Sequence, residues 1–110
     1  MGRYITTTGT ANNVIREVSG AFNASVNDRI LANSTAAAFT ITLPNASTLL
    51  LNDTIQIIDI GGLAATNNIT IGRNGGKIQN IADDLTIDVN GSIITLIWSG
   101  ATYGWIVGSA

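Results

Sequence analysis

Two stretches of this 110-residue chain combine residue types that bind phosphate or calcium in other proteins. Residues 72–77, with the sequence GRNGGK, are rich in glycine and end in a lysine. A phosphate-binding loop also requires a glycine where this chain has Ile71, and a serine or threonine where it has Ile78. We therefore interpret residues 72–77 as a β-turn that carries two solvated cations.

Residues 88–91, with the sequence DVNG, resemble the middle of a calcium-binding loop. In that alignment the first ligand position holds Thr86, and the position of the bidentate glutamate holds Ile97. Because two key ligands are missing, a hairpin turn explains these residues fully.

The acidic pair Asp83 and Asp84 could contact a cation together with Asp59 in a folded trimer. Adjacent aspartates before a strand are more often a solvated turn. We therefore expect no metal site.

The sequence contains few side chains that could act as catalytic groups in an enzyme. The chain contains no histidine and no cysteine, so the usual general base at neutral pH and the thiolate nucleophile are both missing. The seven acidic residues could include a pair for glycoside hydrolysis, but nothing in the sequence fixes the distance between two of them. We expect no enzymatic activity and no cofactor, with a hydrolase as the least favoured class.

The aromatic residues Trp98, Tyr103 and Trp105 cluster near the C-terminus. Such a cluster can stack on sugars or bases, and it can equally anchor a core or a subunit interface. Because no cations lie beside it in the sequence, we favour a core or interface role. A carbohydrate-binding module remains the alternative from another functional class.

Charged residues make up 11% of the chain, whereas soluble domains typically carry about 25%. Isoleucine (17) and threonine (14) each outnumber the 12 charged residues, and asparagine (12) equals them. This composition excludes a coiled coil and charge-driven disorder. The five basic residues form no basic stripe for direct contact with nucleic acid, and no apolar run is long enough to span a membrane.

The pattern along the chain predicts β-strands. Residues 39–43 and 85–89 alternate strictly between apolar and polar side chains, which is typical of strands with one buried face. Residues 54–60 and 68–71 are rich in β-branched residues. Residues 46–51 are the one helical candidate, for a single turn.

An apolar residue followed by Thr-Ile occurs at residues 39–41, 69–71 and 85–87. The unequal spacings, 30 and then 16 residues, argue against a solenoid repeat. We interpret the three segments as the same way of building a strand with one solvated face.

Turn residues complete the fold prediction. Asn90-Gly91 predicts a tight hairpin between residues 85–89 and 92–98, and a longer loop at 99–104 predicts a second hairpin with 105–108. The expected fold is all-β, a small antiparallel β-sandwich or barrel-like body.

The composition changes near Asn27, which divides the chain into an extended N-terminal arm, residues 1–27, and a β-sandwich body, residues 28–110. The arm is poor in apolar residues, and residues 14–18 could form one short strand. We expect the arm to contact neighbouring subunits through its larger apolar residues, which are Tyr4, Ile5, Val14, Ile15 and Val18.

The body carries more isoleucine than one small core requires, because the strands around residues 55–60 and 93–106 need burial on more than one face. We therefore expect a homo-oligomer. The residues assigned to the oligomer interface or the core are Ile55, Ile57, Trp98, Tyr103 and Trp105.

The body contains five characteristic segments in this order: DRILA at 28–32, FTITLP at 39–44, DTIQIID at 53–59, ATNNITI at 65–71 and LTI at 85–87. Trp98 and Trp105 follow them. Over residues 28–107 the chain resembles a small β module of tailed-phage virion structural proteins. Such modules occur in tail-fibre proteins and in short virion proteins of marine cyanobacterial phages, and the opening MGRY is similar to the start of the latter.

This resemblance implies a homotrimeric particle component located in the virion. The first expected placement is a capsid decoration or cement protein, and the second is a neck, collar or tail-fibre attachment subunit. Its partners would be the major capsid protein or the neck and fibre proteins of the same virion. The N-terminal arm would add to a neighbour's sheet through main-chain hydrogen bonds.

Overall fold

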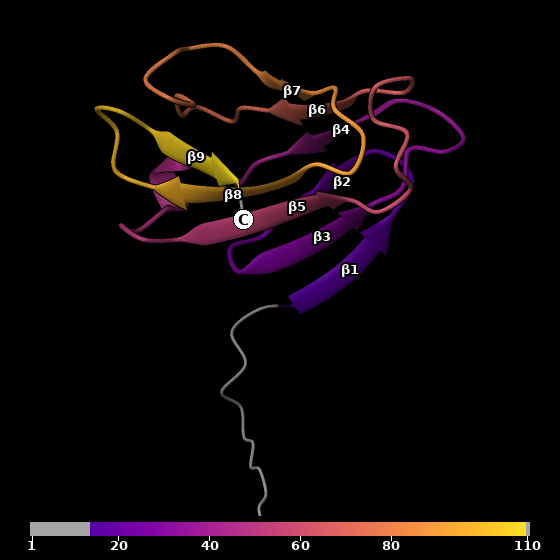
Figure 1. The fold of residues 1–110 in the computed structure, drawn as a ribbon. Helices are drawn as coiled ribbons and strands as arrows, with labels where there is room; N and C mark the ends of the chain where they lie inside the picture. Colours follow the sequence, from indigo (N-terminus) through magenta and orange to yellow (C-terminus); the bar gives the residue numbers. More distant parts are fainter. Residues whose placement is uncertain (1–13, 110) are drawn as a thin grey trace, which may run out of the picture.

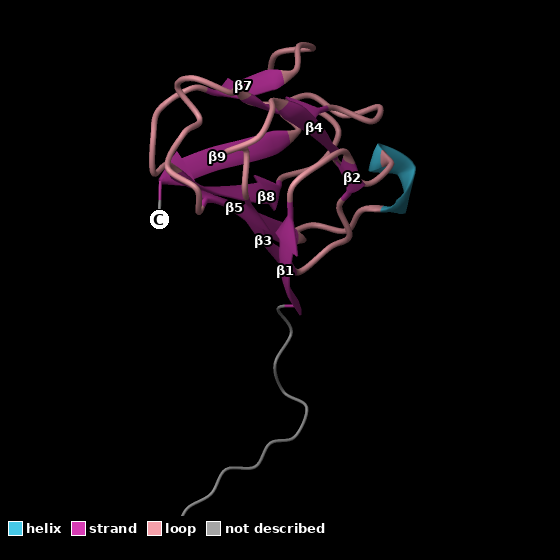
Figure 2. Cartoon of the chain, turned by 90° about the vertical axis from the view of Figure 1, so that its right-hand side faces the viewer, coloured by secondary structure: helices cyan, strands magenta, loops and turns pink. Residues whose placement is uncertain are grey.

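The computed structural model describes residues 14–109, which form two facing β-sheets with the hydrophobic core between them (Figures 1 and 2). The five-stranded sheet has the order β1 (Val14–Val18), β3 (Asp28–Ala32), β5 (Thr54–Asp59), β8 (Ile93–Trp98) and β9 (Trp105–Ser109). The four-stranded sheet has the order β2 (Phe22–Asn23), β4 (Phe39–Thr42), β6 (Ile69–Gly72) and β7 (Leu85–Ile87). The predicted all-β class is confirmed.

Strand pairing is mixed, which corrects the expectation of antiparallel sheets. The first six strands alternate between the two sheets, so each strand returns to its own sheet in the same direction as its predecessor there. β1, β3 and β5 are therefore parallel, as are β2, β4 and β6. Antiparallel pairs follow, joining β7 to β6, β8 to β5 and β9 to β8.

The three apolar-Thr-Ile segments are neighbouring strands of one sheet. Thr40 pairs with Thr70, and Thr70 pairs with Thr86, so β4, β6 and β7 stand in register. The chain winds through both sheets as a coil. β4 and β6 are parallel strands one turn of the coil apart, whereas β7 pairs antiparallel with β6, so the 16-residue spacing belongs to a reversal of the chain and not to a further stacked turn. Their threonines point to one side, while the flanking Ile41 and Ile71 are buried on the other.

The predicted division at residues 27 and 28 does not coincide with a break in the sheets. β1 pairs with β3 and β2 pairs with β4, so residues 14–27 form the first turn of the coil. The Arg16 Nε atom lies 3.3 Å from Asp28 Oδ1, and its guanidinium carbon lies 5.9 Å from the centre of the Phe22 ring. The other predicted arm contacts, Tyr4 and Ile5, lie outside the described residues.

The core is mainly an isoleucine layer between the two sheets. Strict alternation along β3 and β5 turns every second side chain inward. Side chains that are fully buried include Ile30, Ile41, Ile55, Ile57, Ile69 and Ile71. At one end of this layer Trp98 and Trp105 meet edge to face, with 5.4 Å between their ring centres.

One predicted hairpin is confirmed and the other is wrong. β8 and β9 pair across the loop at residues 99–104, as expected. By contrast, β7 and β8 belong to different sheets, so Asn90-Gly91 directs the chain from one layer to the other. Gly91 has a positive φ of 75° but Asn90 does not, whereas the tight hairpin turn needs positive φ at both. The expected single helical turn is present as a 3₁₀ helix, Ala46–Thr48.

Asp59 holds this crossing in place. Its buried carboxylate accepts hydrogen bonds from the backbone N–H groups of Gly62, Ala64 and Gly91, at 3.1, 3.1 and 2.9 Å. The Asn90 side chain accepts a further one from the N–H of Ala65, at 2.8 Å. These bonds join the loop after β5 to the turn before β8, which explains why the chain turns across the sandwich at this point.

Replacing Asp59 with asparagine should lower the free energy of unfolding by about 2–3 kcal/mol, because the amide turns an N–H group toward other N–H donors. Urea denaturation followed by circular dichroism measures the change. Asp88→Asn is the matched control, since Asp88 is exposed, and it should change stability by less than about 0.5 kcal/mol. Equal stability of the two variants would contradict the role of Asp59.

Candidate subunit interface

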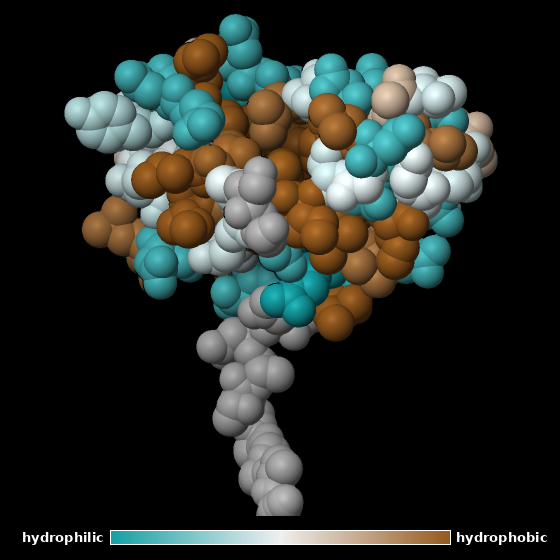
Figure 3. All heavy atoms as spheres, in the orientation of Figure 1, coloured by the Kyte–Doolittle hydropathy of each residue, from teal (hydrophilic) through white to brown (hydrophobic). Residues whose placement is uncertain are grey.

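The outward faces of the two sheets differ in chemistry. On the four-stranded sheet the residues that alternate with the core are mostly threonines: Thr40, Thr42, Thr70 and Thr86. On the five-stranded sheet half of them are large aliphatic residues: Ile15, Leu31, Ile58, Ile93, Ile97 and Ile106. In Figure 3 apolar side chains gather across the middle of the visible face, where Figure 1 has β5 and β8. The difference is specific to one sheet, so it does not follow from the composition of the chain.

The apolar residues of this outer face form two groups. Leu31, Ile58 and Ile93 are direct neighbours on β3, β5 and β8, and together we call them the apolar row. Leu31 and Ile58 are half-buried, and Ile93 remains 39% exposed. Ile97 and Ile106 form a second pair on β8 and β9, 37% and 48% exposed. Exposed aliphatic residues that gather on one face of a sheet favour an interaction site there.

A polar row separates the two groups. Arg29, Gln56 and Thr95 are neighbours on β3, β5 and β8, and the Gln56 amide donates a hydrogen bond of 3.2 Å to the Thr95 hydroxyl. The Arg29 Nε atom is buried and has no hydrogen-bond partner among the described residues. A buried donor without a partner costs free energy, so this guanidinium is incompletely satisfied in the single chain.

The five residues that the sequence assigned to an interface or the core differ in burial. Ile55, Ile57, Trp98 and Trp105 are buried between the sheets and belong to the core. Tyr103 lies in the loop between β8 and β9 and is 60% exposed. A sugar-stacking platform would need the two tryptophans at the surface, so their burial leaves Tyr103 as the accessible aromatic of this cluster.

The arm residues that the structure describes also separate. Ile15 is 62% exposed on the outer face of β1, whereas Val18 packs against the core. Val14 pairs through its backbone with Asp28. Arg29 and Leu31 were not among the predicted site residues, although the alternation of DRILA in β3 places both on the face opposite Ile30.

Residues 72–77 and 88–91, which resemble phosphate and calcium sites in sequence, make contacts within the fold. Gly76 lies against Trp98, where an added Cβ atom would be 2.8 Å from the ring. The Lys77 ammonium donates to the Thr102 carbonyl oxygen at 3.3 Å. Asp59 bonds to backbone groups, and the described residues contain no group of three or more potential metal ligands.

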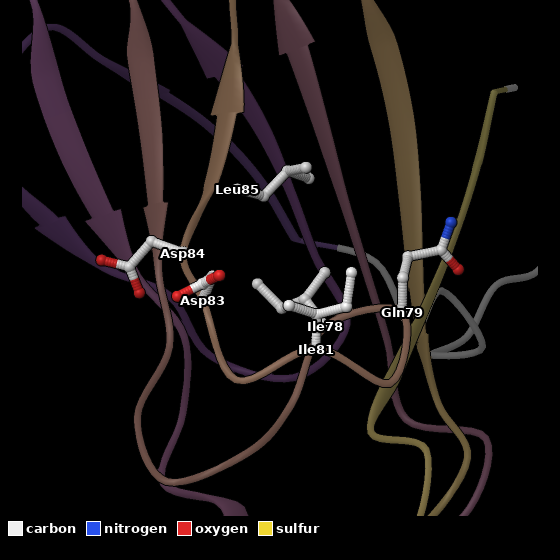
Figure 4. Close-up of a pocket in the computed structure, with 6 residues that line it drawn as sticks. All are labelled: Ile78, Gln79, Ile81, Asp83, Asp84 and Leu85. Atoms are coloured by element: carbon white, nitrogen blue, oxygen red, sulfur yellow. The ribbon is translucent and has the colours of Figure 1, made fainter.

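A pocket of about 310 Å³ lies beside β7 (Figure 4). Ile78, Ile81 and Leu85 line its centre, and Asp84 and Gln79 point away to either side. Asp84 accepts a hydrogen bond of 2.9 Å from the Arg73 N–H and lies 3.7 Å from its guanidinium. The pocket is therefore apolar with a partly neutralised rim.

The sequence matches no protein-family model and shows no significant similarity to a curated protein. Within the described part of the chain, no helix has the length and apolar character needed to cross a membrane.

The aromatic cluster gives a direct test of core against ligand roles. Trp105→Ala should lower the free energy of unfolding by about 3–5 kcal/mol, because it empties a site that is 1% exposed. Tyr103→Ala should change it by less than about 0.5 kcal/mol. Chemical denaturation measures both. A Trp105→Ala variant that kept full stability but lost binding on a glycan array would instead support a carbohydrate-binding module.

Proposed function

We propose that this chain is a structural subunit of a tailed-phage particle, most simply a capsid decoration or cement protein that assembles with copies of itself. The observation that carries the proposal is the aliphatic outer face of the five-stranded sheet, set against the threonine face of the other sheet. Apolar faces of this kind are stable when another surface covers them. The phage context rests on the resemblance over residues 28–107.

In this role the chain acts by adding buried contact area between neighbouring particle proteins. No catalytic step is proposed. The homotrimer implied by the resemblance stays a prediction, and sedimentation of the purified protein at one subunit mass would contradict any self-association. The second placement is a neck, collar or fibre-attachment subunit, which would use the same surfaces.

Quantitative mass spectrometry of purified particles would test the placement. A decoration protein should be present in proportion to the major capsid protein, because the shell repeats its binding site with the capsid lattice. A neck or fibre subunit should be present in a few copies per particle. Absence of the chain from purified particles would contradict the proposal.

The contribution of the N-terminal segment is tested by a deletion that spares the sheets. Removing residues 1–13, which include Tyr4 and Ile5, leaves β1 and β2 intact and should abolish binding to particles while the body stays folded. Removing residues 1–27 also takes away β1 and β2 and should destabilise the body. Co-sedimentation with particles and circular dichroism measure the two effects. Normal particle binding without residues 1–13 would contradict an arm contact.

A further inference from the structure

We infer that the outer face of β1, β3 and β5 packs against the same face of a second copy of this chain about a two-fold axis. In this arrangement Arg29 of each copy meets Glu17 of the other, and the apolar row packs beside these two charge pairs. The inference rests on the self-association proposed above and specifies the partner and the contacts. Its two-fold symmetry takes the place of the three-fold symmetry that the resemblance implies.

The first reason is the state of Arg29 in the single chain. Its guanidinium stays charged in proteins and accepts no hydrogen bonds, so its N–H groups need acceptors. The buried Nε atom has no such partner among the described residues, and Gln56 beside it donates to Thr95. The Nε atom is out of reach of a second molecule, but the side chain is only half-buried. A carboxylate placed over this face would pair with the accessible part of the guanidinium, because arginine and carboxylate groups match in charge and geometry.

The second reason is that the same face carries one carboxylate. Glu17 is exposed on β1 and follows Ile15, the neighbour of Arg29, by two residues. Its carboxylate has a weak contact with the neutral Asn33 amide at 3.4 Å, which leaves its charge uncompensated. Among the described strands of this sheet, Glu17 and Arg29 are the charged residues that face outward. A face with one charge of each sign is complementary to a second copy of itself.

The third reason is that one two-fold axis can form both the two Arg29–Glu17 pairs and the contact between the apolar residues. A two-fold axis that exchanges Arg29 and Glu17 must run through points equally distant from both. Leu31 lies nearer to Glu17, roughly 4.8 Å across the sheet, than to Arg29, roughly 6.6 Å along β3. Ile58 lies nearer to Arg29, roughly 8 Å, than to Glu17, roughly 10 Å. The axis therefore runs between Leu31 and Ile58, and these two residues of one copy would face the same two residues of the other.

Charge reversal tests this arrangement. The wild-type protein should sediment at twice the subunit mass. Arg29→Glu alone and Glu17→Arg alone should each raise the dissociation constant by about tenfold or more, because like charges then meet at both symmetric positions. An equimolar mixture of the two variants should form a one-to-one pair of near wild-type affinity, since each variant supplies the charge that the other lacks. This recovery also shows that both variants are folded.

Thr86→Glu is the control for Arg29→Glu, because it adds a negative charge to the threonine face of the other sheet and should leave the dissociation constant unchanged. Sedimentation equilibrium and native mass spectrometry give the masses. A monomer at all concentrations, a mass of three subunits, or no recovery in the mixture would each overturn the two-fold pairing. A three-subunit mass would leave the proposed structural role intact, and that role is tested separately by the abundance of the chain in particles.

Discussion

The isoleucine layer between the two sheets is the contact on which the rest of the structure depends. Each of the first six strands gives one face to this layer before the chain crosses to the opposite sheet. Because a strand has two faces, filling the shared layer leaves a second face whose chemistry the fold does not dictate. Threonines dominate that second face on one sheet, whereas half of the residues on the other are large aliphatic ones. This asymmetry separates the candidate interface from the rest of the surface.

Alternation within single strands made much of the fold predictable. The FTIT pattern identifies β4 with the correct residues facing inward, since period-two burial depends on the strand alone. The β-branched TIQIID run identifies β5 as a strand but does not show which of its residues face inward. The pairing between strands was harder to predict from the sequence. Asn90-Gly91 has the composition of a hairpin turn, but its conformation is set by Asp59, a residue distant in sequence. Likewise, β1 was assigned to an arm because its partner, β3, is not the next strand in the sequence, and the pattern within a strand does not identify its partner.

The candidate interface was predictable in part for the same reason. The excess of isoleucine correctly indicated apolar residues beyond one core, and Ile58, Ile93, Ile97 and Ile106 do face outward. The sequence could not separate them from Ile55 and Ile57, because adjacent strands must be aligned before the two faces of the sheet are known. Arg29 can be recognised as an interface residue only from the same strand alignment, which places it beside Gln56 on the outer face of the five-stranded sheet.

The positions of β1 and β9 at opposite edges of one sheet have a mechanical consequence. The register places the start of β1 in the same row as Val107, so it lies two residue positions, roughly 6.6 Å, from the end of β9 along the strand direction. Across the sheet the two points are four strand spacings apart, roughly 19 Å, so tension between them would pull mainly across the strands. The hydrogen bonds of an edge strand would then rupture one after another, and a subunit tethered through both ends would yield by peeling of β1 or β9.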